Sequence, residues 1–227
     1  MRLWALLRGD VRFQFKYGFY FLYLVFSLIY IGLLAAFPES WRQKAGVLMV
    51  FTDPAAMGLF FMGAIVLFEK SERVLDSLAV APIKVRDYVL SKLLSIALIS
   101  TAVALAIGIF GRVIASPLYY LLGVVLGSCL FSALGLAVAV RVKTLNEFIL
   151  LTIPVQIIVN IPAIAYVFGF SSVWLLLHPG VCMIELLVGG PHALFALLML
   201  LAWAVMAAVY ACRATERAFA SLGGVKL

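Results

Sequence analysis

Long uninterrupted apolar runs are the feature of this sequence that most limits its fold. A helix needs about 20 mostly apolar residues to cross the hydrocarbon core of a bilayer. Six runs of this kind fill most of the 227 residues, at positions 18–37, 47–68, 88–111, 117–140, 146–168 and 192–212. With 66% hydrophobic residues, the chain carries more apolar side chains than a water-soluble domain of its length buries. The sequence therefore predicts one all-α, polytopic transmembrane domain with six spans over residues 1–227.

The basic residues indicate the orientation of these spans. Fourteen of the 17 Lys and Arg residues flank alternate ends of the spans, and only Arg42, Lys44 and Arg112 lie at the other ends. Basic loops are retained in the cytoplasm during insertion. We therefore expect both termini and the loop after residue 68 to be cytoplasmic. The net charge of +7 then reflects membrane topology, and no nucleic-acid partner is expected.

Three segments outside the regular spans have patterns of their own. Residues 1–17 carry Leu3, Trp4, Leu7, Val11 and Phe15 on one helical face and Arg8, Arg12 and Lys16 on the opposite face. This arrangement predicts an interfacial helix in the headgroup layer. Residues 169–191 are apolar but broken by Pro and Gly, which predicts a re-entrant hairpin of two half-helices in the outer leaflet. Asp53 and Pro54 suit the cap and first turn of a helix, so the helical part of the second span is expected to begin there.

A charged stretch at 68–92 interrupts this apolar chain, with nine of its 27 charged residues. Between Ser71 and Ala81 the pattern is helical: Glu72, Arg73, Asp76 and Ser77 form a polar arc, and Val74, Leu75, Leu78 and Ala81 form an apolar arc. Ser71 suits an N-cap and Pro82 ends the helix. The loop at 69–87 is therefore predicted to hold a short amphipathic helix whose charged face meets solvent or a protein partner.

The charged stretch resembles the signature of ABC-2 type transporter permeases. The matching positions are Glu69, Glu72, Arg73, Leu75, Asp76, Leu78, Val80, Pro82 and Lys92. The chain departs from the family pattern at Arg73-Val74, where Gly-Thr is frequent. The predicted plan is also similar to the type V exporter architecture, with an interfacial helix, six spans, a long first cytoplasmic loop and a re-entrant hairpin. Within the family, the chain most resembles small drug and antibiotic exporters such as the fluoroquinolone-exporter permeases.

This resemblance implies a transport function rather than an enzymatic one. It implies the membrane subunit of an ATP-driven exporter that moves a hydrophobic or amphipathic drug, antibiotic or lipid-like substrate outward across a bacterial or archaeal plasma membrane. The implied partners are two copies of an ATP-binding cassette subunit and a second permease chain, identical or different. The coupling residues that dock the ATPase would be Glu69, Glu72, Arg73, Leu75, Asp76, Leu78 and Pro82. No G-x-x-x-x-G-K-[ST] sequence is present, so ATP and magnesium are expected in the partner and no cofactor in this chain.

Polar side chains inside two of the spans are candidates for a substrate path. Thr152, Gln156 and Asn160 recur at intervals of four residues in the fifth span, and Tyr20, Tyr23, Ser27 and Tyr30 share one arc of the first. Polar groups in lipid must face protein or water. The stripe at 152–160 therefore predicts either a substrate path or dimer seam, or hydrogen bonds between helices. The tyrosines predict either a cavity lining or an interfacial aromatic belt.

Two residues of the outer segment are candidates for an outer gate. Glu185 is an ionisable residue at membrane depth, which is a functional candidate by default; the alternative is an interfacial carboxylate in water beside His178. Neither His178 nor His192 has clustered carboxylate neighbours in the sequence, and no hydrolase motif is present. We therefore expect no metal site and no catalytic residue.

Two other functions fit the same pattern. A membrane scaffold or sensor would use the charged loop to dock a cytoplasmic protein other than an ATPase. A secondary carrier would require a buried acid or base in the middle of the bilayer for ion coupling. The sequence shows no clear candidate for that group.

Overall fold

The computed structural model describes residues 2–80, 83–170 and 172–222, and this part of the chain is helical with no strand. In chain order the elements are α1 (Arg2–Lys16), α2 (Phe19–Ala36), α3 (Glu39–Thr52), the π-helix η1 (Asp53–Gly58), α4 (Leu59–Ser71), α5 (Val74–Val80), α6 (Val85–Phe110), α7 (Pro117–Ala139), α8 (Leu145–Val167), the 3-10 helix η2 (Val173–Leu177), α9 (Pro179–Val188) and α10 (Ala193–Leu222).

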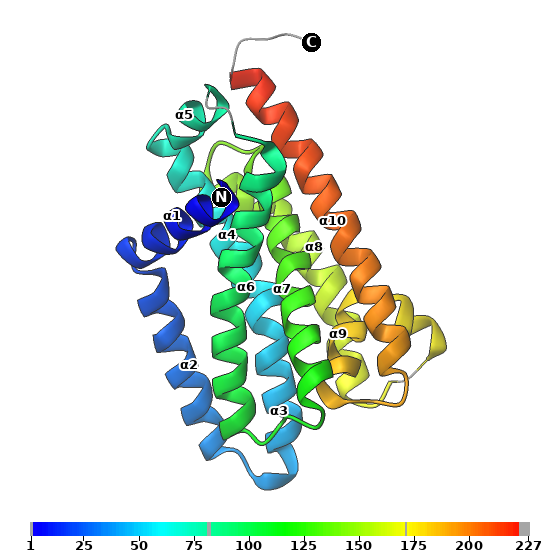
Figure 1. The fold of residues 1–227 in the computed structure, drawn as a ribbon. Coiled ribbons are helices and arrows are strands. Elements are labelled where there is room, and N and C mark those ends of the chain that lie inside the picture. The colour runs from blue at the N-terminus through cyan, green and yellow to red at the C-terminus, as the bar shows by residue number, and fades with distance from the viewer. Residues whose placement is uncertain (1, 81–82, 171, 223–227) are drawn as a thin grey trace.

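Five helices within the described residues, α2, α6, α7, α8 and α10, are long and apolar enough to cross a membrane. They run between the two ends of the molecule, with α6 and α7 near its middle (Figure 1). Over the most apolar stretches of α6 and α7, 56% and 61% of the residues are buried, against 22% in α2 and α8. The exposed Leu, Ile and Phe side chains of the outer helices are therefore available to lipid or to another chain.

The second predicted span is not a single α-helix. Its residues belong to α3, η1 and α4, which follow one another as one rod across the molecule (Figure 1). Proline at position 54 has no N–H group, so it cannot donate the helical hydrogen bond to the carbonyl four residues earlier. A wider π turn is one way for the helix to continue past this missing hydrogen bond. The expectation that the helix begins at Asp53 was wrong, because the helical run begins at Glu39. Five of the six predicted spans thus correspond to helices long and apolar enough to cross a membrane, and the second predicted span is an interrupted rod.

Small residues on α7 let its neighbours come close. A Cβ atom added at Gly123 would lie 2.9 Å from the Leu186 Cβ of α9, and one at Gly135 would lie 2.5 Å from the backbone carbonyl oxygen of Leu59 in α4. Larger residues at these positions would push α9 and the rod away from α7. Close backbone approach of this kind is how membrane helices gain packing contacts.

The charged loop differs from its predicted form. Helix α4 continues through Ser71, Arg73 takes a left-handed conformation with φ 55°, and α5 begins only at Val74. Ser71 is therefore not the N-cap of the short helix. Ala81 and Pro82 lie outside the described residues. Helices α1 and α5 and the last part of α10 lie toward the same end of the molecule (Figure 1).

The interfacial helix and the outer hairpin also differ in detail from their patterns. Leu7 of α1 is buried, whereas Trp4 and Phe15 of the predicted apolar face are exposed. The face that α1 buries is completed by Asp10 and Gln14. In the outer segment, η2 is a 3-10 helix with exposed Val173 and Trp174, and α9 is buried from Pro179 to Leu187. The segment thus contains one short surface turn and one buried helix in place of two similar half-helices.

Candidate functional site: a buried charge cluster beneath an exposed helix

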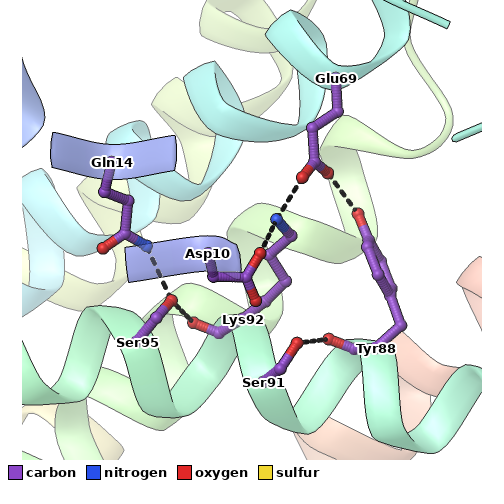
Figure 2. Close-up of polar contacts among 7 residues, drawn as sticks. All are labelled: Asp10, Gln14, Glu69, Tyr88, Ser91, Lys92 and Ser95. Carbon is purple, nitrogen blue, oxygen red and sulfur yellow. Dashed lines mark hydrogen bonds and ion pairs between the residues drawn. The ribbon is translucent and has the colours of Figure 1, made fainter. Parts of the chain in front are cut away.

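Three charged side chains, Asp10, Glu69 and Lys92, meet inside the protein, and we call them the charge cluster. The Lys92 Nζ atom lies 2.5 Å from Asp10 Oδ1 and also forms an ion pair with Glu69. The three residues come from α1, α4 and α6, and the exposed fraction of Lys92 is only 1% (Figure 2). One ammonium group therefore joins three helices that are far apart in the sequence.

Neutral groups extend the charge cluster along α6. The Tyr88 hydroxyl donates a hydrogen bond to Glu69 Oε2 at 2.8 Å, and Lys92 Nζ lies 5.4 Å from the centre of the Tyr88 ring. Gln14 Nε2 of α1 donates to Ser95 Oγ at 2.7 Å, and Ser95 Oγ donates to the Lys92 carbonyl at 2.8 Å (Figure 2). Through these bonds α1 is held to α6 at two points one helical turn apart.

Because the charge cluster is buried, its role is to hold helices together. A charge removed from water is costly, and a buried ion pair offsets that cost only when its partners and hydrogen bonds are in place. Lys92 has two carboxylate partners, and Glu69 accepts from both Lys92 and Tyr88. The arrangement fixes the Ser71 end of α4, and with it the start of α5, against α1 and α6.

Beyond the charge cluster the charged loop turns outward. Glu72, Arg73 and Asp76 are exposed, whereas Leu75 of α5 is buried and Leu78 is half-buried against the core. The polar residues are therefore exposed and the apolar residues are buried or half-buried, as the arcs predict, but Glu72 and Arg73 lie in the turn before α5 and not on the helix itself. The Tyr17 hydroxyl donates to Glu72, and this hydrogen bond raises the pKa of Tyr17 above its ordinary value of 10.0.

The predicted coupling residues accordingly divide into four groups. Glu72, Arg73 and Asp76 are at the surface; Leu75 and Leu78 hold α5 to the body of the protein; Pro82 lies outside the described residues. Glu69 is buried in the charge cluster, so its carboxylate is not available to a docking protein.

A cavity of about 680 Å³ lies beside α5, between the α7–α8 connection and the end of α10, with Asp76, Arg141, Lys143 and Arg217 in its lining. Lys70 closes the end of α7 there. Its Nζ atom donates to the carbonyls of Ala139, Val140 and Val142 at 2.8, 2.9 and 2.7 Å, which are the groups a helix end leaves without partners. Burial lowers the pKa of Lys70 from its ordinary value. This end of the protein is therefore hollowed and largely basic.

The tyrosine arc of the first span lines a groove. Tyr20, Tyr23 and Ser27 border an apolar groove of about 440 Å³ between α2 and α6, together with aliphatic side chains of both helices. Ser27 Oγ donates to the Tyr23 carbonyl at 2.8 Å, so its hydroxyl is satisfied within α2. Tyr30 lies a turn further along and is half-buried. The first three residues of the arc are thus brought together at one surface.

The polar stripe of the fifth span forms bonds within its own helix. Thr152 is buried and donates to the carbonyls of Phe148 and Ile149. Asn160 Nδ2 donates to Gln156 Oε1 at 2.6 Å and to the Gln156 carbonyl at 2.7 Å. These bonds lower the cost of holding amides in an apolar helix. A role of the stripe in transport remains a prediction.

The outer candidates are separate in the structure. Glu185 on α9 is 1% exposed, accepts from the Tyr166 hydroxyl at 2.5 Å and accepts from the His192 backbone N–H at 2.9 Å. The interpretation of Glu185 as a carboxylate in water was therefore wrong. Its bonds tie the α9–α10 turn to α8. His178 lies instead at the start of α9 and lines a mainly apolar cavity of about 540 Å³ with Trp174 and Trp203.

Asp53 is a buried acid, and the sequence alone did not show that it would be buried. Its exposed fraction is 0%, and neither of its carboxylate oxygens has a hydrogen-bond partner among the described residues. It is the fifteenth of the 33 residues from Glu39 to Ser71, near the middle of the rod. The sequence showed no clear candidate for a buried acid at this depth, and the structure places Asp53 in such a position within the rod. Because Pro54 follows Asp53, the sequence was more simply interpreted as the start of a helix.

The charge cluster was also only partly foreseen. Lys92 was noted as a position of the family signature, and Asp10 and Gln14 were not noted at all. A single lysine within the apolar run 88–111 was the available signal, because an ionised group in a span requires a partner. The sequence does not show which of the ten acidic residues supplies that partner.

Comparison with known proteins agrees with this architecture. Residues 1–219 match the profile of the Fluoroquinolones export permease protein family. Two proteins of Mycobacterium tuberculosis, from strains CDC 1551 / Oshkosh and ATCC 25618 / H37Rv, are each named a fluoroquinolones export permease protein. Each is 28% identical to this chain over 183 residues, which cover 76% of this chain and 72% of the relative.

Proposed function

The chain belongs to the fluoroquinolone export permease family, and we propose that it is the membrane subunit of an ATP-driven exporter of amphipathic, drug-like molecules. The family and the apolar helices identify a multi-pass permease of the ABC-2 drug-exporter type. The ATPase partner, the energy source and the substrate class are parts of the proposal. So is the location in a bacterial plasma membrane with the α1 and α5 end in the cytoplasm.

The observation that carries the proposal is the division of the charged loop into an anchored and an exposed side. The charge cluster fixes the end of α4, Leu75 is buried, and Glu72, Arg73 and Asp76 are exposed at the surface. A helix held in this way transmits a push from a bound partner to α4 and α6, because the charge cluster resists local bending. That property suits a coupling element between a soluble ATPase and the spans.

The test is assembly with the ATPase encoded nearest to this permease. Reversing Glu72 and Asp76 to Lys should abolish co-purification of that ATPase or remove the stimulation of its ATP turnover by a fluoroquinolone in reconstituted vesicles. Charged groups at docking surfaces that lose their partners cost about 2–5 kcal/mol. Glu39→Lys is the matched control, since Glu39 is an exposed acid at the opposite end of the rod. Normal assembly and normal stimulation in the double variant would exclude α5 as the coupling element.

Orientation is tested separately. In a background without the three cysteines, single cysteines at Glu39 and Ser172 should react with an impermeant maleimide added to intact cells. Reaction only after lysis would reverse the proposed topology. The same outcome would move α5 to the outside and remove any route to a cytoplasmic ATPase.

A further inference from the structure

Unpartnered polar atoms gather around Asp53 in the core of the membrane domain. Beside its two carboxylate oxygens, the hydroxyls of Tyr23 on α2 and Ser100 on α6 are also buried without a hydrogen-bond partner among the described residues. The Ser100 hydroxyl lies close enough to interact with both Asp53 and Tyr23, but neither contact has the geometry of a hydrogen bond in this conformation. Buried polar side chains are nearly always hydrogen-bonded in folded proteins, so a group of them left open requires an explanation, such as a bound ligand, ion or water.

In its ionised form the Asp53 carboxylate of this group would take a cation as its partner. Within the described residues, the ion pairs of buried carboxylates are those of Lys92 with Asp10 and Glu69, and Asp53 takes part in none. The phenols of Tyr23, Tyr30 and Tyr120 lie within electrostatic range of the Asp53 carboxyl group. A carboxylate among aromatic rings is the environment that attracts an organic ammonium ion, by charge and by cation–π contact.

Depth and access favour a membrane-soluble ligand over an ion from water. At about 1.5 Å per residue, Asp53 lies roughly 20 Å from the Glu39 end of the rod and roughly 27 Å from the Ser71 end. Tyr23 belongs both to this polar group and to the lining of the groove between α2 and α6. The remaining lining of that groove is mainly aliphatic, so it suits the apolar part of an amphipathic molecule.

Helical irregularity at the same place allows the site to change. Asp53 is the first residue of η1, and single π turns within helices occur frequently at functional sites. The rod also packs closely on α7 at Gly135, so a shift of η1 changes the contact between the two elements. In the conformation described here, Asp53 is 0% exposed and does not itself line the groove.

We propose that Asp53 is the charge-recognition residue for a protonated amine on the export substrate, whose apolar body occupies the groove between α2 and α6. The inference rests on the proposed export function and names its substrate class as cationic amphipathic molecules. Tyr23 lines the groove, has a buried hydroxyl without a partner among the described residues and interacts electrostatically with Asp53, so we assign it as a positioning residue for the amine. Movement of the Tyr23 side chain would join groove and carboxylate into one site.

Equilibrium binding to the purified full-length permease in lipid nanodiscs, without ATPase or nucleotide, tests this. The two probes are a fluoroquinolone with a free piperazine amine and its N-acetyl derivative, which lacks the positive charge at that nitrogen. In the unchanged protein, the free amine should bind at least tenfold more tightly. Asp53→Asn should remove that preference, while Asp53→Glu should retain part of it.

Controls separate charge recognition from a folding defect. Glu39→Gln, on the same rod but exposed, should leave both affinities unchanged. If the Asp53→Asn variant lost affinity for both probes equally, the proposal would be overturned, because the residue would then only support the fold of the groove. An unchanged preference for the free amine would overturn it as well. Since no ATPase is present, failure here is distinct from failure of the coupling test with Glu72 and Asp76.

Discussion

Two buried acidic regions of this protein have opposite environments. In the charge cluster, Asp10 and Glu69 share the ammonium group of Lys92, and Tyr88 donates to Glu69. Asp53 has no ion-pair partner and no hydrogen bond among the described residues. The comparison indicates that a partnered charge in a membrane protein holds helices together, whereas an unpartnered one is kept at the expense of stability and is a candidate for ligand binding.

Stability should respond in opposite directions at the two regions. The largest effect is expected for Lys92→Met, which leaves two buried carboxylates without their shared cation. Loss of one partner from a buried ion pair costs about 3–5 kcal/mol. Denaturant unfolding of the purified permease in detergent micelles measures this loss. Lys84→Met is the control, because Lys84 is exposed at the start of the same helix, and a comparable loss there would argue against a special role of the charge cluster.

A smaller loss is expected for Glu69→Gln. Lys92 keeps Asp10 as its counter-ion in this variant, and the amide oxygen still accepts from Tyr88. The change removes one charge-assisted hydrogen bond, which corresponds to about 1–3 kcal/mol. A double-mutant cycle with Tyr88→Phe should show non-additive effects on the free energy of unfolding, since both side chains share one contact. Strict additivity would mean that the two groups act independently.

Asp53→Asn should not reduce stability. Because the carboxylate has no counter-charge, the variant should retain the wild-type free energy of unfolding or gain up to about 1 kcal/mol. The same unfolding measurement as for Lys92→Met allows direct comparison of the two regions. A loss as large as that of Lys92→Met would show that Asp53 has a structural partner and would remove the contrast.

Tyr17→Phe should have the smallest effect, because its bond to Glu72 lies at the surface. The pKa of Tyr17 is raised, so its stabilising contribution is fully present below the ordinary tyrosine pKa of 10.0 and is lost as pH rises through the raised pKa. Any difference in unfolding between wild type and Tyr17→Phe should therefore be constant near neutral pH and disappear in strong alkali. A difference that grows with pH would contradict the assigned direction.

Local patterns in the sequence were enough to predict the class of fold. Apolar runs of span length identified all five of the long membrane helices, because the need to satisfy backbone groups in lipid leaves few alternatives. The division of the charged loop into polar and apolar arcs also followed from helical periodicity, as burial of Leu75 and exposure of Asp76 confirm. The family signature in this loop was a further local feature, and the match over residues 1–219 confirms the resemblance.

Features that depend on distant parts of the chain were decided only by the tertiary structure. Lys92 finds Asp10 at a sequence separation of 82 residues, and α1 buries the polar side chains that this contact requires. Asp53 resembles an ordinary helix cap in the sequence, and only the continuous rod from Glu39 to Ser71 places it in the core. A short stretch of sequence specifies hydropathy and helix ends, but the cost or use of a buried charge depends on which groups other helices bring to it.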